Sequence, residues 1–152
     1  MRLGRAFVTA SVGLLFTSTA FAADLAPNKV PFKDDRVAVS LTGMAGNPEK
    51  GAEVFTNKKL GNCLACHENS AMKTQLFQGD VGPSLDGIGR RRNPEELRAI
   101  VSNSKEVFGP DTVMPGFYSL KVGVDVRKDL VGKTILSAQQ VEDVVAYLST
   151  LK

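Results

Sequence analysis

Apolar residues recur at helical spacing in three short segments of the chain. The clearest stripe follows a capping box at Ser137–Gln140 and consists of Val141, Val144, Val145, Leu148 and Leu151. A second capping box begins at Asn93 and predicts a helix over residues 94–104 with Leu97, Ile100 and Val101 as its buried stripe. Asn47-Pro48 starts a third, short helix that continues to Asn57 and has small or apolar residues on one side.

The segments between these helices have no sustained apolar period. Residues 68–92 and 109–136 are rich in Gly and Pro, and residues 24–46 read as an extended arm that lies on a partner or on the domain surface. No convincing strand pattern is present. We therefore expect an all-α domain over residues 47–152, built from short helices and long loops. So little regular structure requires something central that organises the loops.

The first 22 residues have the three zones of an export signal. Arg2 and Arg5 precede an apolar run from Ala6 to Phe16, and Ala20 and Ala22 fit the pattern that signal peptidases cut. The run is shorter than the roughly 20 apolar residues of a spanning helix. We expect export to the periplasm, cleavage after residue 22 and no stable membrane insertion afterwards.

The charge balance argues against nucleic acid as a partner. The formal net charge of the whole chain is +3, and removal of the signal also removes two arginines. The remaining chain is close to neutral and has no long basic stretch, whereas binding to phosphates requires several clustered Lys or Arg.

Both cysteines and the only histidine lie within five consecutive positions, Cys63 to His67. A disulfide between Cys63 and Cys66 would close a very small loop and add little stability. C-x-x-C-H is the attachment signature of c-type haem, in which the two thiols add to the vinyl groups of one porphyrin. His67 then supplies an axial nitrogen to the iron. We predict one haem c, bound covalently through two thioethers.

Two other interpretations of these residues fit less well. A thiol-redox C-x-x-C requires a strand leading into a helix, and no such strand is predicted here. A zinc site requires four ligands, and the sequence offers no second Cys or His pair.

The second axial ligand is expected to be a methionine, because no second histidine exists. Met72 is tethered close to His67, and Met44 lies on the arm. Met114 lies on a loop rigidified by Pro115 and is the favoured ligand, although a methionine in a loop more often fills the core.

The segment "GDVGPSLDGIGRR" offers two further contacts to a haem. The carbonyl of Pro83 is placed to accept a hydrogen bond from the free ring nitrogen of His67. Arg90, or its neighbours Arg91 and Arg92, is a candidate to pair with a propionate, although a run of arginines is more often only solvated. Plain turns remain the alternative for this segment.

The chain resembles the SoxX family over residues 40–151. The resemblance lies in "SLTGMAGNPEKG", "GNCLACH", "GDVGPSLDGIG", "NPEELRAIVSNSKEVFGPDTVMPGFY" and "GKTILSAQQVEDVVAYLSTL". This resemblance implies a cytochrome c-like fold, with Cys63 and Cys66 at the haem attachment positions, His67 as proximal ligand and Met114 as distal ligand.

The resemblance also implies a functional setting. SoxX is the small monohaem subunit of the SoxAX cytochrome complex, an L-cysteine S-thiosulfotransferase that joins thiosulfate oxidatively to a cysteine of a sulfur carrier protein. Its SoxA partner holds the catalytic haem, and SoxX passes electrons to a downstream acceptor. We expect this chain to be the non-catalytic, electron-accepting subunit, with Phe117 or Leu120 contributing apolar contact surface at the haem edge.

Two rival functions stay open at this point. One is a free periplasmic cytochrome c that shuttles electrons to a terminal oxidase, which co-purification with a second haem protein would distinguish. The other is a gas-sensing or peroxidatic haem protein in which Met114 does not bind the iron.

Overall fold

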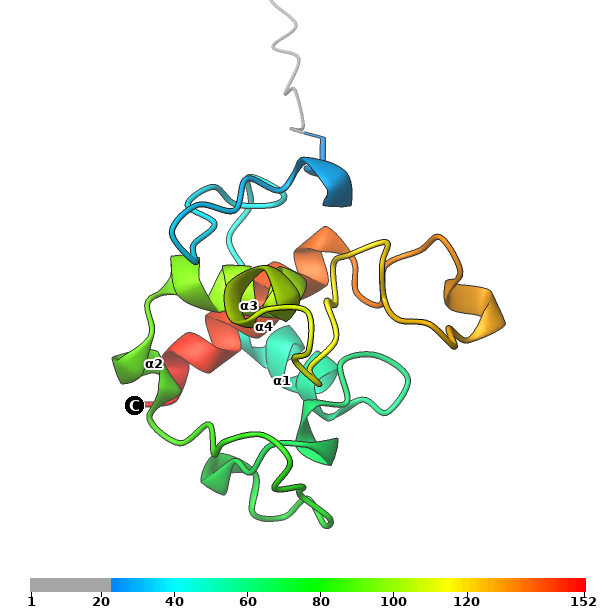
Figure 1. Cartoon of the computed structure of the whole chain (residues 1–152). Helices are drawn as coiled ribbons and strands as arrows, with labels where there is room; N and C mark the ends of the chain where they lie inside the picture. The colour runs from blue at the N-terminus through cyan, green and yellow to red at the C-terminus, as the bar shows by residue number, and fades with distance from the viewer. Residues whose placement is uncertain (1–22) are drawn as a thin grey trace, which may run out of the picture.

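Four α-helices form the frame of residues 23–152. The computed structural model describes residues 23–152, and the predicted export signal lies outside the described residues (Figure 1). The helices are α1 (Pro48–Thr56), α2 (Ile88–Arg91), α3 (Pro94–Phe108) and α4 (Ala138–Thr150). Single 3-10 turns occur at η1 (Pro27–Lys29), η2 (Cys63–Ala65), η3 (Ser70–Met72) and η4 (Lys128–Leu130). Within residues 23–152 the only β pairing is one isolated bridge, so the expected all-α fold is confirmed.

The three main helices begin where their caps predict. Asn47, Asn93 and Ser137 each accept a backbone N–H of the first turn through their side chains, and the latter two complete capping boxes with Glu96 and Gln140. These bonds satisfy donors that a helix start otherwise leaves without a partner.

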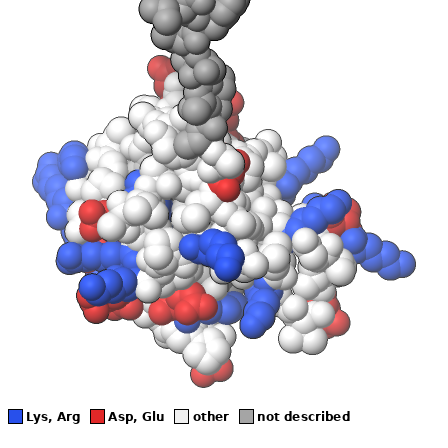
Figure 2. All heavy atoms as spheres, turned by 90° about the horizontal axis from the view of Figure 1, so that it is seen from above, with Lys and Arg blue, Asp and Glu red and all other residues white. Residues whose placement is uncertain are grey.

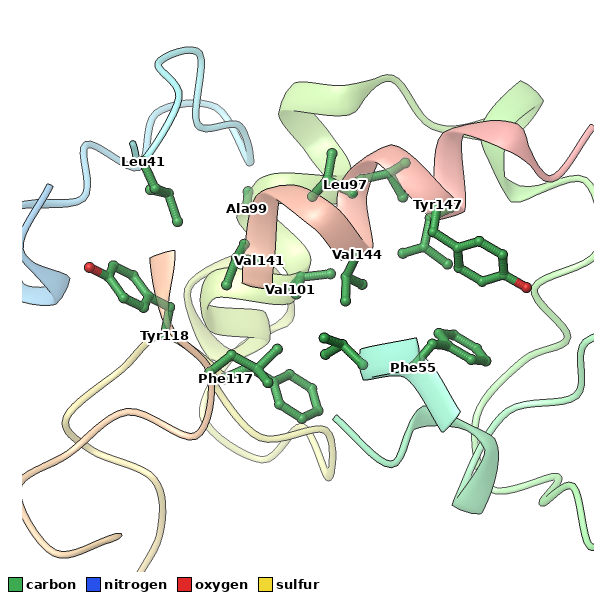
Figure 3. Close-up of a cluster of buried hydrophobic side chains, with 14 of the residues drawn as sticks. Leu41, Phe55, Leu97, Ala99, Val101, Phe117, Tyr118, Val141, Val144 and Tyr147 are labelled. Atoms are coloured by element: carbon green, nitrogen blue, oxygen red, sulfur yellow. The ribbon is translucent and has the colours of Figure 1, made fainter. Parts of the chain in front are cut away.

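Helix α4 is the centre of the core. Its apolar face packs against α1, α3 and α2, and all five residues of the predicted stripe are buried. Figure 3 shows side chains of α1, α3 and the loop before α4 converging on this face. The labelled residues include Phe55, Leu97, Val101, Phe117, Val141, Val144 and Tyr147. On α3 the predicted stripe is partly wrong, because Ala99 is fully buried whereas Ile100 is only half-buried.

Helix α1 crosses α4 closely at Gly51. A Cβ at this position would overlap the Asp143 carbonyl and lie 2.8 Å from Tyr147 Cβ. The rings of Phe55 and Tyr147 then meet with centroids 5.4 Å apart at 60°, a tilted arrangement that aromatic pairs favour. This contact fixes the start of the segment that follows α1.

The N-terminal arm packs on the same domain. Val37 and Leu41 are 0% and 1% exposed and belong to the core. Arg98 forms a two-pronged ion pair with Glu142, with Nε–Oε1 and Nη2–Oε2 distances of 2.8 and 3.0 Å. The same two side chains bind the arm, because Arg98 donates to the Val37 carbonyl and Glu142 accepts from the Leu41 N–H. The arm is therefore held by a buried charge pair.

Two elements differ from the sequence prediction. Helix α3 extends to Phe108 rather than ending at 104, and it contains a non-helical residue at Asn103. Helix α2 was missed because four residues are too short to show an apolar period. No helix among residues 23–152 is long and apolar enough to cross a membrane.

Candidate functional site

The Cys63–His67 segment forms a single tight turn after α1. The N–H groups of Cys66 and His67 both donate to the Cys63 carbonyl, at 3.1 and 3.0 Å. One turn therefore presents both thiols and the imidazole ring from a short stretch of backbone. Leu64 between them is buried and anchors the turn in the core.

Both thiols are free, and Cys66 is exposed while Cys63 is half-buried. Burial raises the pKa of Cys63 to about 12, against a smaller lowering effect of its own backbone hydrogen bond. Thiol-redox C-x-x-C sites work with a lowered thiol pKa instead. The described residues also contain no group of three His, Cys, Asp or Glu side chains that could hold a metal ion.

The ring of His67 is fixed by the following loop. Its Nδ1 lies 2.7 Å from the Pro83 carbonyl oxygen. A carbonyl can only accept, so Nδ1 carries the proton and Nε2 keeps its lone pair. The hydrogen bond expected from the sequence is therefore present, and it holds the ring in the tautomer that an axial ligand requires.

Gly82 makes this contact possible. A Cβ at residue 82 would overlap the His67 ring, with Nδ1 only 2.6 Å away. Three backbone hydrogen bonds hold the loop beside the turn. The N–H groups of Gly79 and Gly82 donate to the carbonyls of Leu64 and Cys66, both at 2.8 Å. The Leu85 N–H donates to the Glu68 carbonyl at 2.9 Å. The sequence predicts only a turn at Gly82, although its position next to Pro83, whose carbonyl was expected to accept from the histidine, was the available signal.

The methionine candidates have different surroundings. Met114 is half-buried and packs against the core, whereas Met44 is 52% exposed on the N-terminal arm. Met72 is half-buried in η3, close to His67 in sequence. The Met114 carbonyl accepts a 2.6 Å hydrogen bond from Ser104, a contact that no sequence pattern indicated. Its assignment as axial ligand stays a prediction.

The three consecutive arginines have different contacts. Arg91 donates to the carbonyls of Ser84 and Asp86 and so braces the loop that carries Pro83. Arg92 forms an ion pair with Glu96 at the start of α3, with 3.6 Å between Nη1 and Oε1. The Arg90 side chain is exposed and makes no hydrogen bond or ion pair within residues 23–152. Its pairing with a propionate stays a prediction.

One of the two residues expected to form apolar contact surface is buried instead. Phe117 is only 7% exposed and lies in the core, so the prediction that it forms contact surface is wrong. Leu120, by contrast, is 47% exposed. The face drawn in Figure 2 carries Lys and Arg among Asp and Glu side chains and shows no large area of a single sign.

The residues around the turn fit a covalently bound haem. Two unpaired thiols and an imidazole with a free Nε2 form a donor set typical of c-type cytochromes. Gly82 and the Pro83 carbonyl together hold the ring in this orientation.

Comparison with known proteins agrees with this geometry. The cytochrome c family model matches residues 48–152. A chain of the crystal structure of SoxXA from P. pantotrophus is 43% identical and superposes with a TM-score of 0.78, covering 86% of this chain and 99% of that one. Comparison with curated protein sequences gave no match. On the matched residues and this identity, the chain belongs to the cytochrome c family and is a cytochrome of the SoxX type.

Proposed function

We propose that this chain is the electron-accepting subunit of a SoxAX-type complex, which couples thiosulfate to a cysteine of a carrier protein. The observation that carries the proposal is the turn itself, with free thiols at Cys63 and Cys66 and the His67 ring fixed 2.7 Å from Pro83. The 43% identity to a chain of a SoxXA structure supports the choice of complex.

Each residue of the site has a defined task in this proposal. Cys63 and Cys66 would attach one haem c through thioethers, and His67 and Met114 would hold its iron through a nitrogen and a sulfur. The bound haem supplies a reversible one-electron iron couple. The Pro83 carbonyl keeps His67 in its orientation through the Nδ1 proton, which raises the basicity of the coordinating nitrogen.

The same ligands exclude substrate chemistry in this chain. Cys63 and Cys66 are the only cysteines of the sequence, and thioether formation uses both. No thiol would then be left to hold a sulfur intermediate, and with His67 and Met114 both bound the iron would offer no open position to substrate. The chain therefore moves electrons while its partner performs the coupling.

The electron balance sets the role of the subunit. Coupling thiosulfate to a carrier cysteine forms an S–S bond between the cysteine sulfur and the outer sulfur of thiosulfate. This oxidation releases two electrons and one proton, the proton coming from the thiol. A one-electron carrier must therefore pass on an electron twice for each coupling event. The partners are a SoxA-type cytochrome, the carrier protein through the complex, and a downstream acceptor.

The proposed location is the periplasm. The predicted signal at residues 1–22 directs export, and covalent haem attachment to exported chains takes place in that compartment. After cleavage we expect no stable membrane insertion.

Reconstitution tests the proposal. Purified holoprotein, thiosulfate, carrier protein and an oxidised electron acceptor are mixed with and without a SoxA-type partner, and haem reduction and carrier mass are followed. We expect the mass of the thiosulfate adduct and reduction of this haem only when the partner is present. Adduct formation with this chain alone, or turnover with partner while this haem stays oxidised, would refute the subunit role.

A further inference from the structure

Helix α3 is interrupted at Asn103, one residue before its last buried serine, Ser104. Asn103 has φ −155° and ψ 94°, far from helical values, and its Oδ1 accepts from the Lys105 N–H at 3.4 Å in the manner of a new N-cap. The interruption frees the carbonyls of Val101 and Ser102 from the helix. They accept from the N–H groups of Phe117 and Tyr118, at 3.3 and 2.9 Å.

The last turn of α3 holds the loop that contains Met114. Ser104 Oγ donates to the Met114 carbonyl at 2.6 Å. Lys105 Nζ donates to the carbonyls of Pro110 and Thr112. A Cβ at Gly116 would lie 2.5 Å from Asn103 Oδ1 and 2.9 Å from Ser119 Cβ, so a larger residue there would displace the Asn103 side chain.

We propose that Ser104 is a positioning residue for the Met114 thioether. This inference rests on the proposed role of Met114 as axial ligand. The Ser104 side chain is 0% exposed, and a buried hydroxyl-to-carbonyl bond fixes the backbone of the ligand itself rather than a distant part of the loop. A thioether binds ferric iron weakly, so the preformed loop keeps the sulfur from being displaced by an added ligand.

Ser102 provides a matched control in the same helix. It is also 0% exposed, and its Oγ has no hydrogen-bond partner among the described residues. Ser102→Ala and Ser104→Ala each remove one buried oxygen of equal volume. Only the second removes a bond to the Met114 carbonyl, so a difference between the variants reports that bond rather than core packing.

The test is a titration of the oxidised holoprotein with imidazole, which competes with the methionine for the iron. We expect Ser104→Ala to lower the apparent dissociation constant about tenfold, as loss of one hydrogen bond would, and to weaken the methionine-to-iron charge-transfer band. Ser102→Ala should change the dissociation constant less than twofold. Equal constants for the two variants would overturn the inference.

Met114→Ala separates this inference from the ligand assignment. With Met114 absent, imidazole should bind without competition, and addition of Ser104→Ala should change the affinity less than twofold. If Met114→Ala leaves imidazole affinity and the charge-transfer band unchanged, the ligand assignment of the proposed function fails. If Met114→Ala abolishes the band while Ser104→Ala behaves like Ser102→Ala, only the role of Ser104 fails.

Discussion

The helices and the loops of this protein are stabilised in different ways. The helix side, α1, α3 and α4, contributes most of the buried hydrophobic side chains. The loop side, residues 57–87 and 109–136, extends away from the crossing of these helices in Figure 1 and carries the Cys63–His67 turn. It also carries most of the exposed large apolar side chains, namely Leu76, Phe77, Val81, Val113, Leu120, Val124 and Val131.

This difference shows which half of the molecule depends on the haem. The helix side buries its own apolar face, and this burial drives its folding. The loop side is held by hydrogen bonds, such as the backbone bonds from Gly79 and Gly82 to the Cys63–His67 turn, and only a few of its side chains, among them Leu64 and Phe117, are buried in the core. Loops of this length without a core of their own require an apolar body to pack on.

The largest expected effect on folding follows from removing the haem. Cys63→Ser together with Cys66→Ser should yield a chain without covalent haem, whose loop side loses protection from amide hydrogen exchange. The single variants should each keep one thioether. Exchange mass spectrometry and acid-acetone extraction check the result, and haem that stays with the doubly substituted chain after extraction would contradict it.

The next largest effect is expected from an ion pair on the helix side, and an ion pair on the loop side serves as its control. Arg98→Met leaves Glu142, 4% exposed, without its partner, and should lower the free energy of unfolding by about 3–5 kcal/mol. Arg127 forms an equally close pair with Asp129, at 2.7 and 2.9 Å, but both side chains are more than half exposed. Arg127→Met should therefore cost less than about 1 kcal/mol. Denaturant unfolding of the two holoproteins measures this, and similar losses would argue against a role for burial.

A smaller effect is expected from the crossing of α1 and α4. Gly51→Ala places a Cβ against the Asp143 carbonyl and should cost about 1–3 kcal/mol by forcing the helices apart. Gly123, on the loop side, has no atom within 4 Å of an added Cβ. Gly123→Ala should change the free energy of unfolding by no more than about 0.5 kcal/mol. If Gly51→Ala leaves the free energy of unfolding unchanged, the two helices do not pack closely at this position.

The smallest effect concerns an exposed carboxylate on the loop side. Hydrogen bonds from Ser70, donated by its hydroxyl and its N–H at 2.5 and 2.8 Å, lower the pKa of Asp86. The stability from this contact is present above the unfolded pKa and is lost as the pH falls through the lowered folded value. Ser70→Ala should raise the Asp86 pKa toward its ordinary value in an NMR titration. An unchanged pKa would show that the Ser70 hydroxyl does not set it and that the N–H of residue 70 or the nearby cations do.

The helix side was largely predictable because its signals are local. The caps at Asn47, Asn93 and Ser137 and the apolar stripe of α4 are properties of neighbouring residues. The end of α3 was not predictable, because the interruption at Asn103 is compensated by contacts with residues 116–118, which lie on a distant loop. Burial of the arm likewise depends on Arg98 and Glu142, which are far from it in sequence.

The site was predictable only where chemistry requires a particular residue type. Two thiols and an imidazole at fixed spacing indicate haem attachment, and the need to fix the ring pointed to the Pro83 carbonyl. Ser104 acts through the close approach of separate segments, and nothing in its own neighbourhood distinguishes it from Ser102. Gly82 also acts through close approach, and only its position next to Pro83 sets it apart from other turn glycines.

The most direct test of the account is the mass of the peptide that contains Cys63 and Cys66 after proteolysis of the native, exported protein. The account predicts that this peptide carries the mass of one haem and that neither cysteine reacts with an alkylating reagent. An unmodified peptide in which both cysteines are alkylated would contradict the haem site and, with it, the proposed role in electron transfer.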